Sequence, residues 1–116
     1  MANLRVLIVE DEGMVSMLLE DMLSELGHTV AGLAPRLELA RKLAERIEVD
    51  LAILDVNLDG EASYPVAEIL AARGVPLIFA TGYGNTGLNE DWKRMPVLSK
   101  PFQIRELAAA IARATA

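Results

Sequence analysis

Short runs of apolar residues alternate along the chain with longer segments in which apolar residues recur every three or four positions. The runs have the length of strands and lie between turn residues; they cover residues 4–9, 29–33, 50–54, 75–80 and 96–99. Most are apolar throughout rather than at every second position, which is typical of parallel strands buried on both faces. Since parallel strands need a helical crossover, the pattern predicts right-handed βαβ units in a single α/β domain, residues 1–116.

Five helices are predicted between and after these strands. The first runs from residue 14 to Gly27, a glycine suited to a helix C-terminus, and we expect its methionines to pack in the core. The second is opened by Pro35, because proline costs no hydrogen bond in a first turn. The third opens at Tyr64, a short fourth covers about residues 88–93, and the last covers about 103–113, with 57–63 left as a loop. The buried stripes expected on the first two helices comprise Met14, Val15, Met17, Leu18, Met22, Leu23 and Leu26, and then Leu39, Ala40, Leu43, Ala44 and Ile47.

Composition and charge narrow the class of protein. The chain has 116 residues, 53% of them hydrophobic, and no apolar run approaches the roughly 20 residues of a membrane span. It lacks a signal-peptide layout. Cysteine is absent, which excludes disulfides and cysteine-ligated metals and fits a reducing compartment, so we expect a cytoplasmic protein. The net charge of −6 argues against nucleic acid as a partner.

Polar residues follow four of the apolar runs. These are Glu10 with Asp11, then Asp55, Thr81, and Lys100 with Pro101. Because the carboxyl ends of parallel strands lie together at one edge of the sheet, we expect these groups to share one rim. Carboxylate oxygens suit Mg²⁺, and the backbone carbonyl of Asn57 is close enough in sequence to add a ligand. The sequence therefore predicts a Mg²⁺ site formed by Glu10, Asp11, Asp55 and Asn57.

Asp55 is the candidate nucleophile at this rim. A carboxylate can accept a phosphoryl group, and the transfer depends mainly on alignment and charge neutralisation. Lys100 would pair with Asp55 or its phosphate, and the Thr81 hydroxyl would donate to a phosphate oxygen. Taken singly, each residue has a simpler explanation, such as acidic residues near a helix N-terminus or a solvated lysine. Their joint occurrence at successive strand ends favours the chemical interpretation.

Four motifs together resemble one known family, the receiver domain of bacterial two-component response regulators. They are Val-Glu-Asp-Glu at 9–12, Leu-Asp-Val-Asn-Leu at 54–58, Phe-Ala-Thr-Gly-Tyr at 79–83 and Ser-Lys-Pro-Phe at 99–102. The resemblance spans residues 4 to about 114 and implies a flavodoxin-like fold with sheet order 2-1-3-4-5. It further implies that Asp55 accepts phosphate from a histidine of a sensor histidine kinase or phosphotransfer protein, and that the Lys100–Pro101 bond is cis.

Two features depart from the usual receiver pattern. Receivers commonly carry a switch aromatic where this chain has Val97. The Phe-Ala-Thr-Gly-Tyr motif is similar to that of a receiver subgroup that lacks this aromatic, in which the glycine-rich motif carries the switch. We therefore expect Gly82, Tyr83, Gly84 and Trp92 to carry the output. The chain ends with the last predicted helix, so we expect it to act alone or to have been cut from a longer protein.

The sequence thus favours a single-domain response regulator that binds a downstream protein target or relays phosphate. It would not be a conventional enzyme, at most catalysing its own Mg²⁺-dependent phosphorylation and dephosphorylation, and we expect a monomer or weak dimer without a membrane or nucleic-acid partner. One alternative is a flavodoxin-like small-molecule binder, although Glu10, Asp11 and Glu12 stand where a phosphate-binding glycine loop would. Another alternative is a constitutive interaction module, which the complete acidic set disfavours.

Overall fold

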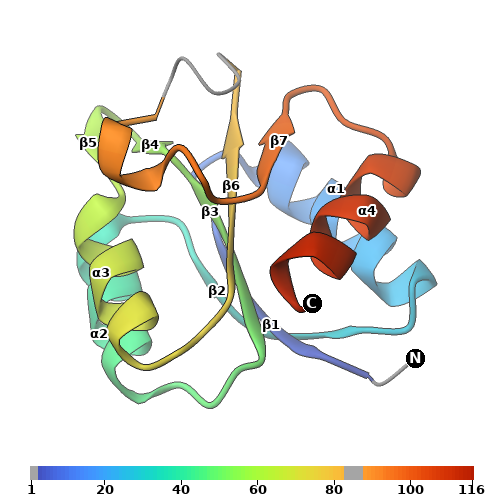
Figure 1. Ribbon diagram of the computed structural model, residues 1–116, viewed down its shortest axis with the longest axis horizontal. Helices are drawn as coiled ribbons and strands as arrows, with labels where there is room; N and C mark the ends of the chain where they lie inside the picture. The colour runs from blue at the N-terminus through green and yellow to red at the C-terminus, as the bar shows by residue number, and fades with distance from the viewer. Residues whose placement is uncertain (1–2, 83–87) are drawn as a thin grey trace.

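The computed structural model describes residues 3–82 and 88–116, and its core is one five-stranded parallel sheet (Figure 1). The strands are β1 (Arg5–Val9), β2 (Thr29–Ala34), β3 (Leu51–Asp55), β6 (Leu77–Thr81) and β7 (Val97–Ser99). They lie in the order β2-β1-β3-β6-β7, and every neighbouring pair is parallel. Counted along the main sheet this is the order 2-1-3-4-5, so the predicted flavodoxin-like fold is confirmed.

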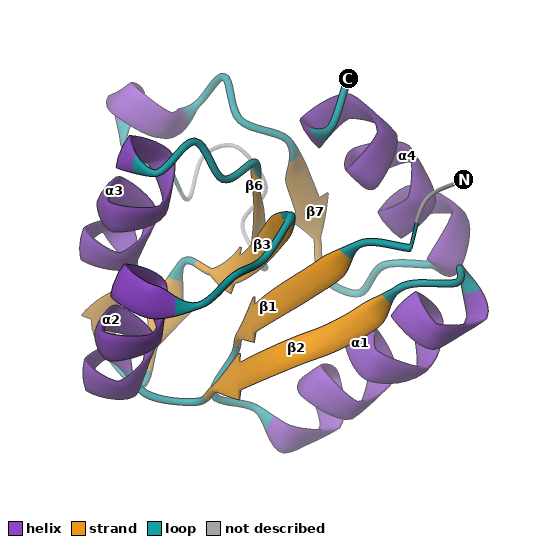
Figure 2. Cartoon of the chain, turned by 90° about the horizontal axis from the view of Figure 1, so that it is seen from below, coloured by secondary structure: helices purple, strands orange, loops and turns teal. Residues whose placement is uncertain are grey.

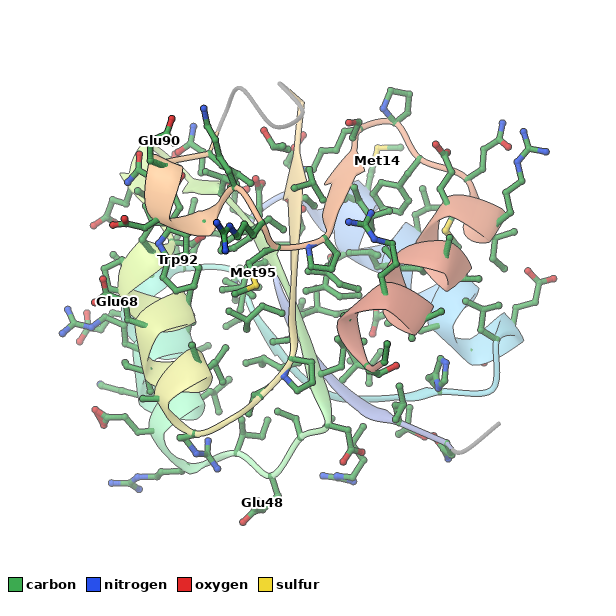
Figure 3. The ribbon with its side chains drawn as sticks, in the orientation of Figure 1. Met14, Glu48, Glu68, Glu90, Trp92 and Met95 are labelled. Carbon is green, nitrogen blue, oxygen red and sulfur yellow. The ribbon has the colours of Figure 1, made fainter. Side chains whose placement is uncertain are left out.

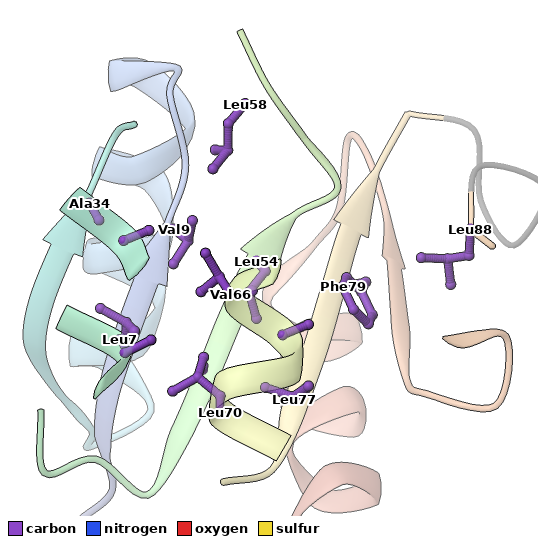
Figure 4. Close-up of a cluster of buried hydrophobic side chains, with 14 residues drawn as sticks. Leu7, Val9, Ala34, Leu54, Leu58, Val66, Leu70, Leu77, Phe79 and Leu88 are labelled. Carbon is purple, nitrogen blue, oxygen red and sulfur yellow. The ribbon is translucent and has the colours of Figure 1, made fainter. Parts of the chain in front are cut away.

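Four α-helices cover the two faces of the sheet. Figure 2 shows α1 (Gly13–Glu25) with α4 (Ile104–Ala114) on one side, and α2 (Leu37–Arg46) with α3 (Tyr64–Ala72) on the other. Alternate residues of each strand enter opposite cores. In β1, Leu7 and Val9 belong to the core under α2 and α3 (Figure 4), while Val6 and Ile8 belong to the core under α1 and α4. This alternation explains why the strands are apolar throughout.

Residues 57–63, predicted as a loop, contain a second small sheet. Strands β4 (Asn57–Leu58) and β5 (Glu61–Ala62) pair antiparallel. The two turn residues between them, Asp59 and Gly60, both have positive φ, at 50° and 88°. Aspartate followed by glycine suits a tight hairpin turn of this kind. The sequence therefore marked the turn correctly, but two-residue strands are too short to show alternation.

The predicted buried stripe of α1 is partly wrong. Met14 and Met17 are 87% and 63% exposed, and Leu18 is also exposed. Leu23 is buried as predicted, and Val15, Met22 and Leu26 are half-buried against the core. Ser16 and Leu19, which were not predicted, are buried as well. Ser16 can take an inward position because its hydroxyl donates to the Gly13 carbonyl at 3.0 Å. One side of α1 consequently presents large apolar side chains to solvent.

The second helix also differs from its prediction in two respects. It begins at Leu37 after an extended Arg36, so Pro35 precedes the helix and does not open it. Leu39, expected in the buried stripe, is 44% exposed, whereas Ala40 and Ala44 are buried. The other predicted members, Leu43 and Ile47, are half-buried and pack against the same core, so Leu39 alone departs from the predicted stripe.

The predicted fourth helix is reduced to one 3₁₀ turn, η2 (Glu90–Trp92), so four α-helices are present in the described part of the chain. The turn is closed by the Trp92 N–H, which donates to the Asn89 carbonyl at 3.0 Å. It is held by packing of the Trp92 ring rather than by helix propensity. Among residues 3–82 and 88–116, no helix combines the length and apolar character needed to cross a membrane.

Candidate functional site

The carboxyl ends of β1, β3, β6 and β7 meet at one edge of the sheet and bring the predicted polar residues together. They surround a pocket of about 570 Å³. Its lining comprises Asp11, Glu12, Asp55, Val56, Asn57, Asp59, Gly60, Thr81, Gly82 and Lys100. Glu10 lies beneath this lining and is only 2% exposed. The strand order alone therefore accounts for the assembly of residues that lie up to ninety positions apart in the chain.

Lys100 is the cation at the centre of the site. Its Nζ lies 3.0 Å from Asp55 Oδ2, 3.1 Å from Glu10 Oε1 and 3.5 Å from Glu12 Oε1. The Lys100 backbone N–H also donates to the Thr81 carbonyl at 2.9 Å, which ties the two strand ends together. Burial alone would lower the pKa of the Lys100 ammonium, but hydrogen bonds and charge from Asp55 and Glu10 outweigh burial and raise it. Lys100 is therefore held as a charged partner for Asp55.

Glu10 is the most buried acid of the site. Burial is the main cause that raises its pKa to about 7, and the negative charge of Asp55 adds to the effect. The Glu12 N–H, which donates to Glu10 Oε2 at 3.1 Å, and Lys100 act in the opposite direction. Its other oxygen, Oε1, is buried and receives no well-oriented hydrogen bond, although Lys100 Nζ is near. Glu10 is thus a carboxylate with unused acceptor capacity.

The β4–β5 hairpin closes one side of the pocket through backbone N–H groups. The Asp59 N–H donates to Asp11 Oδ2 at 2.9 Å, and the Asn57 N–H donates to Asp55 Oδ1 at 3.2 Å. The hairpin itself is braced by the Gly60 N–H, which donates to Asn57 Oδ1 at 2.8 Å. Asp59 was not among the predicted site residues, and only its place in the Asp-Gly turn after Asp55 could have suggested it.

The acids of the site are close enough together to share one cation. One carboxylate oxygen from each of Glu10, Asp11, Glu12 and Asp55 lies within 4.8 Å of the others. An all-oxygen donor set suits a hard divalent ion such as Mg²⁺, and the unsatisfied Oε1 of Glu10 is consistent with a further ligand. The residues present therefore fit the predicted ion. Glu12 was overlooked as a candidate, although it directly follows Glu10 and Asp11.

Residues 6–112 match the response regulator receiver domain. The chain belongs to this family. Receiver identity agrees with the sheet order and with the acidic pocket at the strand ends.

Several known proteins resemble this receiver over most of its length. It is 38% identical to the transcriptional regulatory protein PdtaR of Mycobacterium tuberculosis, over 92% of this chain and 54% of that protein. It is 34% identical to the phyllosphere-induced regulator PhyR of Methylorubrum extorquens, over 94% of this chain and 42% of that protein. The chain thus spans about half the length of the curated relatives it matches.

Two solution structures of SdrG are also similar. The structure of SdrG from Sphingomonas melonis Fr1 has 42% identity and a TM-score of 0.90, with 100% of both chains covered. The BeF3-activated conformation of SdrG, from Pseudomonas melonis Fr1, has 42% identity, full coverage of both chains and a TM-score of 0.84. The receiver described here is therefore more similar to the first of these two structures.

The residues predicted to carry the output are only partly described. Gly82 lines the pocket, and Thr81 is buried at the end of β6. Val97 pairs with Phe79 in the sheet, so this receiver has no aromatic ring at that position. Trp92 packs against the core under α3, as Figure 3 shows. Tyr83 and Gly84 lie outside the described residues. Lys100 and Pro101 are joined by a cis peptide bond.

Proposed function

We propose that this receiver is a phosphorylation-controlled switch in which Asp55 accepts a phosphoryl group from a histidine of a partner protein. The observation that carries the proposal is the Lys100 ammonium held 3.0 Å from Asp55 Oδ2 inside an acidic pocket. A purely structural ion pair would not require three further carboxylates, which leave the site rich in negative charge. This excess of negative charge suits a site that takes up a cation.

The chemistry of the transfer can be assigned to individual groups. An oxygen of Asp55 attacks phosphorus, the phosphorus–nitrogen bond to the donor imidazole breaks, and the imidazole leaves with the bonding electron pair and takes up a proton. The Asn57 N–H on Oδ1 fixes the orientation of the attacking carboxylate. Lys100 then compensates charge on the phosphoryl oxygens, and the Thr81 hydroxyl donates to one of them. Asp55 is the phosphoacceptor, and Lys100 and Thr81 stabilise the group it receives.

Mg²⁺ would be held by Glu10, Asp11, Asp55 and the carbonyl of Asn57, and when bound it supplies positive charge to the transferring group. Glu12 belongs to the same cluster and is a further candidate ligand or outer partner. Asp59 keeps Asp11 in place through its N–H. The hairpin therefore supports Asp11 through Asp59 and also brings the backbone of Asn57 to the site.

The phosphoryl donor is proposed to be a histidine kinase or a phosphotransfer protein that covers the rim of the pocket. Asp55 is buried, so a donor imidazole has to enter the pocket while its protein lies on the surrounding surface. Met14 and Met17 offer large exposed apolar groups at the N-terminal half of α1, two to five residues beyond Glu12. Figure 3 shows the position of Met14. Methionine is adaptable at such contacts. These side chains are the proposed anchor for the donor.

We further propose that residues 1–116 work as one receiver unit whose output is a contact with a protein target. The continuous sheet and the full-length similarity to the solved SdrG chain support this unit. Nucleic acid is not proposed as the target, because the formal charge of −6 would repel phosphates.

Intact mass after incubation with Mg²⁺ and acetyl phosphate tests the function. The parent protein should gain one phosphoryl group, and Asp55→Asn should gain none while it keeps its fold. Asp21→Asn, which removes an exposed carboxylate from α1, is the matched control and should react like the parent. An unmodified parent would favour a constitutive interaction module or a small-molecule binder over a phosphorylation switch.

A further inference from the structure

Three aromatic rings pack together on the α3 side of the sheet. The rings of Tyr64 and Trp92 are stacked, with centroids 6.2 Å apart and planes inclined by 12°. Phe79 completes the group, with its centroid 5.6 Å from Trp92 in an edge-on arrangement and 6.1 Å from Tyr64. Such pairs are stabilising beyond the area they bury. The three residues come from α3, β6 and η2, so the cluster joins three separate elements.

Tyr64 also holds η2 through its hydroxyl. The Asn89 N–H donates to Tyr64 Oη at 2.9 Å, in an exposed position. Asn89 is the residue before the 3₁₀ turn, and its carbonyl accepts the Trp92 N–H. The side chain of Tyr64 therefore holds the turn at both ends, with the hydroxyl at its start and the ring at its end.

Two short routes connect this cluster to the Asp55 pocket. Tyr64 directly follows Ser63, whose N–H donates to the carbonyl of Val56 at 2.9 Å, and Val56 is the residue after Asp55. On the other side, Phe79 lies two residues before Thr81 in the same strand. Val56 and Thr81 are therefore each one short backbone step from a residue of the aromatic cluster.

We propose that Tyr64 is a positioning residue that latches η2 in the free protein, and that filling the Asp55 pocket releases its bond to Asn89. This inference rests on the proposed function, because it describes how that pocket controls the surface around residues 88–92. The hydrogen bond is exposed, so water can replace it at little cost when the surrounding backbone shifts. At Val97, β7 has no aromatic ring that could link the pocket to η2. Tyr64, in contrast, packs against Phe79 of β6 and accepts a hydrogen bond from Asn89 at the start of η2.

The latch makes a quantitative prediction for ligand affinity. If the bond exists only in the free state, its removal raises the fraction of molecules competent to bind, and apparent affinity rises with that fraction. Tyr64→Phe deletes the hydroxyl and keeps the ring. We expect it to bind beryllofluoride, at saturating Mg²⁺, about two- to twelvefold more tightly than the parent, the equivalent of one net hydrogen bond.

A second variant removes the same bond from its other end. Asn89 has φ of −65°, which proline adopts without strain, so Asn89→Pro deletes the N–H donor while Tyr64 is untouched. Asn89→Pro should also bind beryllofluoride more tightly than the parent. The double variant should have an affinity little higher than that of either single variant. Thr29→Val is the control, because it removes a hydroxyl that bonds to Asn3 at the start of β2. That variant should bind like the parent.

The experiment is a beryllofluoride titration in the presence of Mg²⁺, followed by calorimetry and by the emission of Trp92, the single tryptophan of the chain. The parent should bind and its Trp92 emission should change, since the stack on Tyr64 loosens. Unchanged or weaker binding by folded Tyr64→Phe and Asn89→Pro, or constant Trp92 emission in the loaded parent, would overturn the latch while the proposed function stands. A parent that binds no beryllofluoride would overturn both.

Discussion

Glu10→Gln should make the free energy of unfolding of the metal-free protein less dependent on pH, rather than simply lower it. Glutamine keeps the shape of a protonated glutamate and can still accept the Glu12 N–H that Glu10 accepts at 3.1 Å. In the parent, the folded state resists ionising this buried acid, because its pKa is raised from 4.5 to about 7. The substitution removes that cost, so the free energy of unfolding of the two proteins should diverge as the pH rises.

The size and sign of the effect follow from linkage. A group whose pKa is higher in the folded state stabilises the fold fully below its unfolded pKa, and this stability is lost as the pH rises through the folded value. The shift from 4.5 to about 7 corresponds to about 3.5 kcal/mol at most, at about 1.4 kcal/mol per pH unit. Between pH 5 and 8 the parent should therefore lose about 2–3 kcal/mol relative to Glu10→Gln.

Urea unfolding in chelator at several pH values between 5 and 8 measures this difference. Glu25→Gln, which removes an exposed carboxylate at the end of α1, should follow the parent and serves as the control. Parallel stability curves for the parent and Glu10→Gln would refute the claim that burial keeps Glu10 from ionising. Saturating Mg²⁺ should reduce the divergence, because a bound cation stabilises the ionised form of Glu10 in the parent alone.

Three further predictions concern the same end of the sheet. Millimolar Mg²⁺ should raise the melting temperature of the parent, by binding the native state, and Glu10→Gln/Asp11→Asn should show no such rise in calorimetry; an equal rise would place the metal elsewhere. Lys100→Met should slow acetyl phosphate labelling at least tenfold and lower the unfolding free energy at pH 8 by about 2–4 kcal/mol, because buried carboxylates lose their counter-charge; unchanged values would remove Lys100 from the site. Met14→Ser should slow labelling by a phosphorylated partner protein but not by acetyl phosphate, and equal slowing of both would contradict docking at α1.

The sheet and the site could be predicted because each depends on a local signal combined with one rule. Apolar runs located the strands, and the rule that parallel strands end at one edge brought Glu10, Asp55 and Lys100 together. Distances and ionisation states could not be predicted, because they depend on how far each acid is buried. The sequence gives no sign that Glu10 lies under the pocket while Glu12 stands at its rim.

Helix faces and short elements were predicted less well. The methionines of α1 follow the spacing of a buried stripe, yet Met14 and Met17 are exposed, because the adjacent face with Leu19 and Leu23 meets the sheet. Spacing fixes the width of an apolar stripe but not which part of a wide stripe is covered. The role of Tyr64 was missed for a different reason, since its partners Phe79 and Trp92 are distant in sequence and meet only in the folded chain.

The central claim is that Asp55 itself carries the phosphoryl group, and locating the modification tests it most directly. The parent is treated with Mg²⁺ and acetyl phosphate, reduced with borohydride to convert the acyl phosphate into a stable alcohol, digested, and analysed by peptide mass spectrometry. We expect a reduced side chain at position 55 and unmodified acids at Glu10, Asp11 and Glu12. Modification of any of those three in place of Asp55, or of no residue, would contradict it.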